Sequence, residues 1–209
     1  MNPIDTHNTN LSSRHEDKLV ELESLAYSIA LQDMIDPAFE LAYDRLTKLA
    51  TKLLKVPVAL VSIASADDQF FKSFEGLGQE WAEHRISPRS AHYCRHVVDT
   101  GQILEIEDAS ADPELRDDPV TKQMGVVAYI GIPITLQNGA TLGSFCAIDT
   151  KPHKWSAEEK SIMLELNEFL VREIELRLAL NQAKIARVKA EEANARVVNI
   201  LDGMLDAGM

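Results

Sequence analysis

Basic residues and long apolar runs are scarce in this chain of 209 residues. The 21 Lys and Arg residues stand against 33 Asp and Glu residues, which gives a net charge of -12. This balance argues against nucleic acid as a partner, because binding to phosphates requires a basic face, and it gives no support for docking on anionic membranes. No apolar run approaches the roughly 18 to 20 residues that a membrane span needs. We therefore expect neither a nucleic-acid nor a membrane partner.

Cysteine is equally rare, and the first residues lack the features of a secretion signal. The chain contains two cysteines, Cys94 and Cys146, which are too far apart in the sequence to build a disulfide framework. Residues 1–14 are polar and have no apolar stretch of the kind found in signal peptides. These features predict a cytoplasmic protein with free thiols.

The start of the chain is expected to hold a disordered lead and two helices. Residues 1–12 are assigned to the lead. Ser13 and Glu16 have the spacing of a capping box, which predicts an N-terminal helix over 13–35. A second helix is expected to begin at Pro37, because proline suits the first helical position.

The middle of the chain alternates short strands with turns, which indicates an α+β domain built on an antiparallel sheet. Runs rich in Val, Ile and Phe predict strands, and the pair Asn138-Gly139 predicts a tight hairpin turn. The expected elements are strands 56–64 and 69–74, a loop over 75–89, a helix ending at Thr100, a strand over 102–106, a helical turn over 120–124, and strands 126–136 and 141–149.

The last part of the chain has no Pro or Gly between its second capping box, at Ser156 and Glu159, and Gly203. This predicts one helix of more than forty residues, a length typical of coiled coils. Residues 178–209 are assigned to a C-terminal coiled-coil signalling helix. Five of its apolar residues fit a heptad seam, and with two residues of the N-terminal helix they form the expected dimer interface: Leu22, Ile29, Val171, Ile174, Leu178, Ile185 and Val188.

Several motifs occur in one order along residues 37–177. They are Phe70-Phe71-Lys72-Ser73-Phe74-Glu75-Gly76-Leu77, the helix phrase around Cys94, the Asp108-Ala109 turn, Gly131-Ile132-Pro133, Gly143-Ser144-Phe145-Cys146-Ala147-Ile148-Asp149 and Trp155-Ser156-Ala157-Glu158-Glu159. In this order they resemble the GAF domain, a bacterial sensing and dimerisation module. The resemblance implies the GAF fold, with a central antiparallel sheet of about six strands flanked by helices.

The resemblance also implies a small-molecule pocket on one face of the sheet and helices on the other. Strand alternation puts Tyr129, Gly131 and Pro133 on one side, and Ile130, Ile132 and Ile134 on the side that suits helix packing. The candidate pocket residues are Phe71, Tyr93, Cys94, Asp108, Tyr129, Gly131 and Cys146.

Cofactor and metal motifs are not found. Residues 120–124 hold neither the Cys nor the His with which phytochrome-like GAF domains attach a bilin, and the cyclic-nucleotide signature of the family cannot be assembled. His92 and His96 share a helix face but have no evident third ligand. We therefore expect no metal site and leave the ligand unidentified.

Three functions are compatible with this pattern. The first is a non-enzymatic sensor that forms a homodimer and relays ligand binding through its helices to an output domain or partner, such as a histidine kinase or a diguanylate cyclase. The second is a thiol-dependent reductase of the free methionine sulfoxide reductase type. It would use Cys94 as nucleophile and Cys146 as resolving partner, against the simpler interpretation that both thiols only pack in the core. The third is a structural dimerisation module in which side chains fill the space beside Gly131.

Overall fold

The computed structural model describes residues 37–64, 68–88, 92–113, 115–117 and 119–206. The predicted disordered lead over 1–12 and helix over 13–35, with Leu22 and Ile29, lie outside these residues. By its internal contacts the chain divides into one unit ending at Val171 and a second over Arg172–Met209. The division predicted from the sequence, into a domain over 37–177 and a C-terminal coiled-coil helix over 178–209, stays a prediction.

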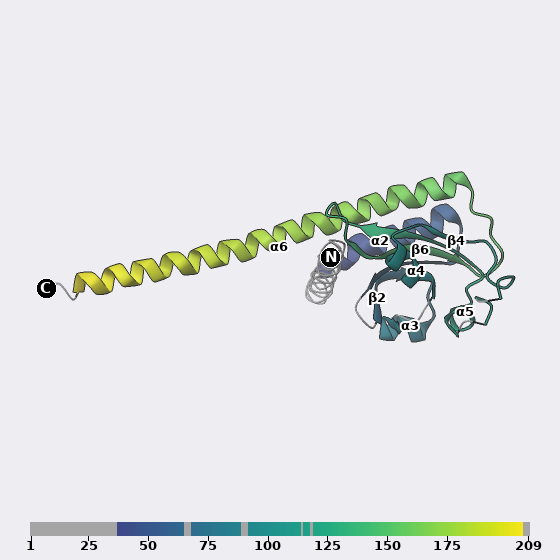
Figure 1. The fold of residues 1–209 in the computed structure, drawn as a ribbon, viewed down its shortest axis with the longest axis horizontal. Coiled ribbons are helices and arrows are strands. Elements are labelled where there is room, and N and C mark those ends of the chain that lie inside the picture. Colours follow the sequence, from purple (N-terminus) through teal and green to yellow (C-terminus); the bar gives the residue numbers. More distant parts are fainter. Residues whose placement is uncertain (1–36, 65–67, 89–91, 114, 118, 207–209) are drawn as a thin grey trace, which may run out of the picture. The chain divides into compact units, whose positions relative to one another are not determined.

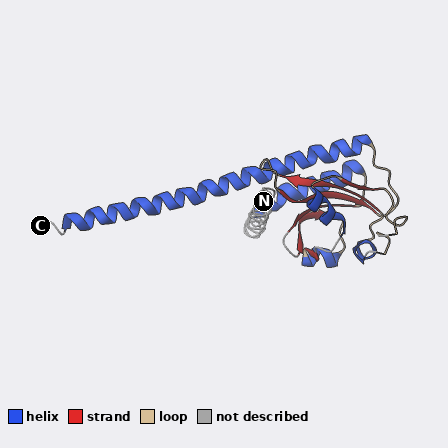
Figure 2. Ribbon diagram, in the orientation of Figure 1, coloured by secondary structure: helices blue, strands red, loops and turns tan. Residues whose placement is uncertain are grey.

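A six-stranded antiparallel sheet forms the centre of the first unit, in the order β3-β2-β1-β6-β5-β4 (Figures 1 and 2). The predicted α+β class and number of strands are confirmed. The strands are β1 Val58–Ala64, β2 Asp68–Glu75, β3 Ile86–Pro88, β4 Leu104–Ile106, β5 Ala128–Thr135 and β6 Thr141–Asp149.

One face of the sheet is covered by α2 (Pro37–Leu54) and by the first turns of α6 (Ala157–Asp206). The buried side chains of α2 recur three or four residues apart, as helical periodicity requires; they are Tyr43, Thr47, Ala50 and Leu54. Ser73 on β2 fixes the register of α2, because its hydroxyl lies 2.6 Å from Asp44 Oδ1 and 3.0 Å from Thr47 Oγ1. Asn167 of α6 donates to the carbonyl of Pro133 on β5 at 3.0 Å.

The opposite face is covered by α4 (His92–Thr100), which packs on β1, β5 and β6. Gly101 ends α4 as predicted, with a φ of +63° that favours glycine. The short helix α5 (Pro119–Met124) follows β4 and an irregular segment.

The segment between β2 and α4 is a correction to the sequence prediction. A loop was expected over 75–89, but the structure has the helix α3 (Gln79–His84) followed by the edge strand β3. Gly76 and Pro88 favoured a loop in the sequence. In the structure Gly76 directly follows β2, and Pro88 is the last residue of β3. Trp81 packs against the apolar cluster under α4, and this tertiary contact stabilises a helix that local propensity does not reveal.

The connection from β6 to α6 is held by a charged cluster. His153 Nδ1 lies 2.9 Å from Asp149 Oδ2, and His153 Nε2 lies 2.9 Å from Glu159 Oε1. Each of the two imidazole nitrogens therefore faces a carboxylate, an arrangement that suits the protonated ring. The ring also stacks on Trp155, with 4.2 Å between centroids.

The predicted capping box at the start of α6 is confirmed. Ser156 Oγ accepts from the backbone N–H of Glu159 at 3.2 Å, and Glu159 Oε2 accepts from the backbone N–H of Ser156 at 2.8 Å. Together with the His153 contact, this holds the first turn of α6 to the end of β6.

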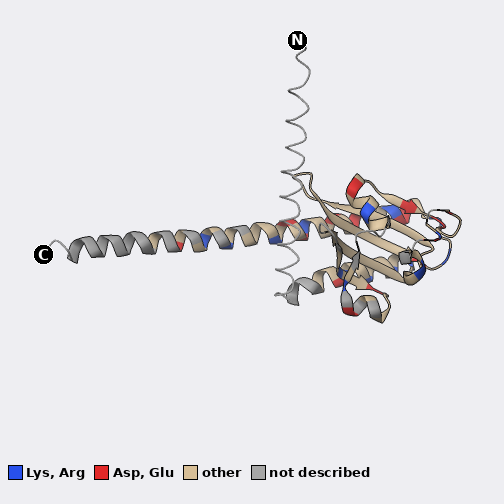
Figure 3. Ribbon diagram, turned by 60° about the horizontal axis from the view of Figure 1, so that its bottom comes forward, with Lys and Arg blue, Asp and Glu red and all other residues tan. Residues whose placement is uncertain are grey.

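The helix α6 runs without a break for 50 residues, which confirms the predicted length. Basic and acidic residues are interspersed along its described part (Figure 3), including the i, i+4 pairs Glu173–Arg177 and Arg187–Glu191. Among the described residues, no helix combines the length and apolarity needed to cross a bilayer.

Stability should depend on pH through His153. Its contacts to Asp149 and Glu159 raise its pKa, although burial opposes the charge. A raised pKa contributes stability below the unfolded value of about 6.5, and this contribution is lost as pH rises through the folded pKa. We expect the difference in unfolding free energy between the wild type and His153→Gln to shrink from pH 6 upward. The exposed His96 supplies the control His96→Gln, which should change little; equal pH dependence in both variants would contradict the assignment.

Candidate functional site

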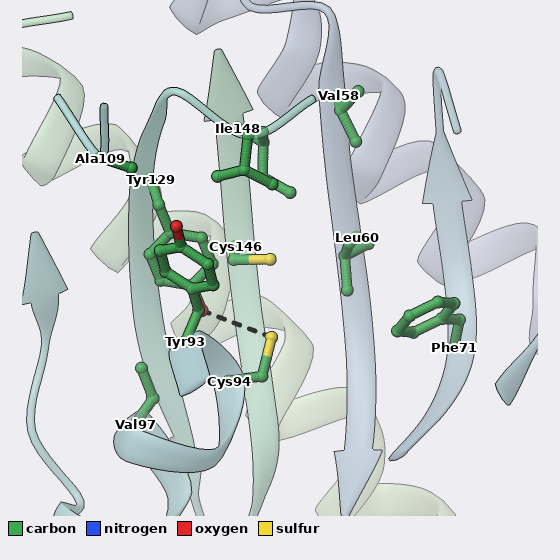
Figure 4. Close-up of a cluster of buried hydrophobic side chains, with 11 residues drawn as sticks. Val58, Leu60, Phe71, Tyr93, Cys94, Val97, Ala109, Tyr129, Cys146 and Ile148 are labelled. Atoms are coloured by element: carbon green, nitrogen blue, oxygen red, sulfur yellow. Dashed lines mark hydrogen bonds between the residues drawn. The ribbon is translucent and has the colours of Figure 1, made fainter. Parts of the chain in front are cut away.

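Buried side chains from five elements form one cluster beneath α4 (Figure 4). Five of the seven candidate pocket residues belong to it; they are Phe71, Tyr93, Cys94, Tyr129 and Cys146. Gly131 lies directly opposite Cys146 in the β5–β6 ladder, so the sixth candidate adjoins the cluster. The structure therefore brings together residues that lie up to 75 positions apart in the sequence.

The ring of Tyr129 lies across Gly131. A Cβ atom at position 131 would meet the Tyr129 hydroxyl and ring carbons at distances that real side chains do not allow. Glycine is therefore required at this position for the ring to lie flat along its own strand. The space beside Gly131, which the sequence suggested as part of a cavity, holds the Tyr129 ring.

Tyr93 of α4 packs against Tyr129, with ring centroids 5.0 Å apart and planes tilted by 36°. This separation is typical of attractive aromatic pairs. The Tyr93 hydroxyl lies 2.7 Å from Thr121 Oγ1 of α5, so it ties α5 to the cluster. Both tyrosine rings are almost fully buried, at 3% and 1% exposure.

The two thiols meet in the same cluster. Cys94 comes from α4 and Cys146 from β6, and both are free and buried. The neighbouring Cys146 thiol has the largest effect on the pKa of Cys94 and lowers it, whereas burial opposes the charged form and raises it. Burial raises the pKa of Cys146, and the neighbouring Cys94 adds to the effect. The Tyr129 hydroxyl donates to Cys94 Sγ at 3.4 Å.

Two serines that the sequence analysis missed complete the polar part of the cluster. Ser62 Oγ on β1 lies 3.0 Å from Ser144 Oγ on β6, and both side chains are 0% exposed. Hydrogen bonding from Ser144 and Ser62 lowers the pKa of Cys94 further. The signal that could have found Ser144 is strand alternation, since it lies two residues before Cys146 and therefore on the same face.

A family model described as the GAF domain matches residues 39–176. The chain belongs to the GAF domain family. The match spans the sheet, both helical layers and the start of α6, so the whole cluster beneath α4 lies inside the GAF domain. The family and fold predicted from the motif order are confirmed.

Relatives of this GAF domain occur in bacterial signalling proteins. A cyclic di-GMP phosphodiesterase of Pseudomonas aeruginosa is 30% identical over 133 residues, which cover 63% of this chain and 22% of that protein. The chain thus matches less than a quarter of this curated relative.

Solved structures with the same fold include other GAF domains. One, from a phosphoenolpyruvate-protein phosphotransferase of Coxiella burnetii, has a TM-score of 0.59 at 18% identity and covers 78% of this chain and 98% of that chain. Another is a domain of a two-component sensor histidine kinase protein from Sinorhizobium meliloti 1021, with a TM-score of 0.56 at 18% identity. It covers 71% of this chain and 99% of that chain. At this identity they establish the fold alone.

The seventh candidate, Asp108, lies outside the buried cluster of the GAF domain. Its carboxylate accepts from the backbone N–H of Ser110 at 3.0 Å, which is a turn-forming contact. The adjacent Ala109 is 0% exposed and belongs to the cluster. A role for Asp108 in ligand binding stays a prediction, and it would require the side chain to leave this turn.

Gln69 of β2 is a further polar residue on the α4 side that the sequence analysis did not select. It is 1% exposed, and its Nε2 has no hydrogen-bond partner among the described residues. Gln69 lies two positions before Phe71, so strand alternation places both on the same face. A buried amide with an unmet donor is costly, and a polar ligand group would satisfy it.

Replacement of Gly131 should test how tightly Tyr129 is packed. Gly131→Ala forces the Tyr129 ring away from β5, and we expect it to lower the unfolding free energy by about 2 kcal/mol. In a Tyr129→Ala background the new Cβ meets open space, so the same change should cost at least about 1 kcal/mol less. Urea unfolding of the four proteins measures this coupling.

Gly78→Ala is the matched control, because a Cβ there meets nothing within 4 Å. Its effect should stay within about 0.5 kcal/mol. Additive effects of Gly131→Ala and Tyr129→Ala would contradict the packing described for the ring.

Proposed function

We propose that this GAF domain is a sensor that binds a small molecule beneath α4, forms a homodimer through its helices, and relays the ligand state to an output domain or partner protein. The ligand acts as a regulator and is not chemically transformed. The proposal extends to a cytoplasmic location.

The observation that carries the proposal is the polar interior of the α4-covered face. Ligand sites are mostly apolar with a few convergent polar groups. Here the Tyr129 hydroxyl donates to Cys94, and the bonded pair Ser62 and Ser144 lies on the same face of the sheet, beside an otherwise apolar cluster. The unmet donor of Gln69 lies on the same face.

In the proposed sensor the Tyr129 ring and the ligand compete for the space beside Gly131. Ligand binding therefore requires the ring to leave Gly131. A ligand shifts the balance between the two states only by its difference in affinity for them. Because β6 continues through Asp149 to the His153 contact, movement beneath α4 has a short covalent path to the start of α6.

The structural dimerisation module is the second candidate, and one observation favours it. The Tyr129 ring fills the space beside Gly131, as that hypothesis requires. In that case the polar groups of the cluster only hydrogen-bond to one another and bind no ligand.

The reductase hypothesis has weaker support. It requires a reactive thiol that is also accessible, but Cys94 is 8% exposed and Cys146 is 0% exposed. A substrate as large as an amino acid cannot reach either sulfur without a rearrangement of α4.

Ligand binding is tested by native mass spectrometry of the protein purified from its own cells. We expect a non-covalent added mass that disappears under denaturing conditions. The variant Ser144→Ala, which removes one polar group from the interior, should reduce its occupancy. A protein without added mass, and without any thermal stabilisation across a metabolite panel, would favour the structural module.

Dimer formation is tested on α6. Val188 belongs to the predicted seam and is 52% exposed, whereas Ile174, another predicted seam residue, is already 1% exposed within the chain. Val171 and Leu178 are partly exposed, and the side chain of Ile185 lies outside the described residues. We expect Val188→Glu to weaken the dimer at least tenfold by burying charge in the seam.

The control is Ala190→Glu, which adds the same charge at an exposed position about half a turn around the helix. Light scattering across a dilution series gives both dissociation constants. A wild type that is monomeric at micromolar concentration, or equal effects of the two changes, would overturn this seam.

A further inference from the structure

Cys94 and Cys146 are the two cysteines of the sequence, and their sulfurs lie side by side in the interior (Figure 4). One belongs to a helix and the other to the central strand, at positions 52 residues apart. Both side chains belong to the same buried cluster, and the Tyr129 hydroxyl lies 3.4 Å from Cys94 Sγ on the side that faces β6. A disulfide requires about 2 Å between the two sulfurs, so its formation needs a shift of α4 toward β6.

We propose that Cys94 and Cys146 form a reversible intramolecular disulfide when a small hydroperoxide enters the core. This makes the interior of the domain a redox site in addition to the proposed ligand site. It does not depend on the dimer or on a bound metabolite.

The reaction has two balanced steps. The Cys94 thiolate attacks one peroxide oxygen; the S–O bond forms, the O–O bond breaks, and the alkoxide or hydroxide that leaves takes up a proton. The Cys146 thiol then attacks the sulfenic sulfur of Cys94. The S–S bond forms, the S–O bond breaks, and the departing hydroxide leaves as water with the proton of Cys146. Each sulfur gives up one electron, and a dithiol reductant returns both.

The surroundings of Cys94 explain why it reacts first. The Tyr129 hydroxyl donates to its sulfur at 3.4 Å, and the nearby Cys146, Ser144 and Ser62 side chains also lower its pKa, which more than offsets the opposing effect of burial. Cys146 has the opposite bias, because burial and the neighbouring Cys94 raise its pKa and keep it protonated. This division gives one nucleophile and one resolving thiol, as redox-sensing pairs require.

Burial selects the oxidant. Since Cys94 is 8% exposed and Cys146 is fully buried, a molecule close to the size of water reaches them far more easily than a disulfide or a bulky hydroperoxide. Oxidation also removes the thiolate to which Tyr129 donates, so the ring that lies across Gly131 loses one of its anchors.

Intact-mass spectrometry of the full chain after treatment with hydrogen peroxide tests the proposal. The native monomer should lose two hydrogen atoms and regain them with dithiothreitol. With two cysteines in the chain, this mass identifies the bond. An unchanged mass, oxygen addition confined to methionines, or a covalent dimer would each overturn the proposal.

Single-thiol variants separate the two steps. Cys146→Ser should stop at the sulfenic acid, which dimedone traps on Cys94, whereas Cys94→Ser should not react with dimedone. Dimedone labelling of Cys146 at the rate of Cys94 would contradict the assigned roles. If either variant fails to fold, as judged by circular dichroism, the roles are tested with the tyrosine pair instead.

Tyr129→Phe removes the hydroxyl that donates to Cys94 but keeps the ring. We expect disulfide formation below neutral pH to slow by about tenfold, because a hydrogen bond to a charged group is lost. Tyr93→Phe is the matched control, since its hydroxyl bonds to Thr121 instead of sulfur. Equal rates in the two variants would overturn the role of Tyr129. Disulfide formation without a bound metabolite would support this proposal alone. The ligand-sensing proposal is tested separately by native mass spectrometry.

Discussion

Burial of β6 on both of its faces is the constraint on which the rest of this GAF domain depends. Every residue from Leu142 to Asp149 is buried, and β1 and β5 pair with its backbone on either edge. A strand with no solvent-facing side needs cover on both sides, which α2 and the first turns of α6 supply on one face and α4 on the other. Ser144 and Cys146 must therefore find their partners inside, and the polar groups beneath α4 gather around them.

Local signals predicted most of the fold, because they act over a few residues. The Asn138-Gly139 turn, the glycine after α4 and the capping box at Ser156 each belong to a short segment whose geometry its own residues determine. The helix α3 was missed because its stability comes from tertiary packing, in which Trp81 contacts Phe71 of β2 with 6.0 Å between ring centroids. The family motifs added the order of the elements, which local patterns do not provide.

The candidate site was predictable only in part, for a related reason. Alternation along β5 placed Tyr129 and Gly131 on the correct side, but it could not show that the ring of one fills the space left by the other. The contact between Ser62 and Ser144 spans 82 residues and depends on the register of β1 against β6. The meeting of Cys94 with Cys146 likewise needs the docking of a helix on a strand. Asp108 was selected from its motif, whereas the geometry assigns its carboxylate to a turn.

The edges of the sheet also limit how two copies of the protein can associate. Each outer strand, β3 and β4, has three residues, and β3 includes Pro88, which has no N–H to donate. Short or proline-bearing edges offer few backbone groups to a neighbouring strand, a common protection against aggregation. Pairing of sheets across subunits would thus gain few hydrogen bonds, which leaves the helical surfaces as the more favourable route to assembly.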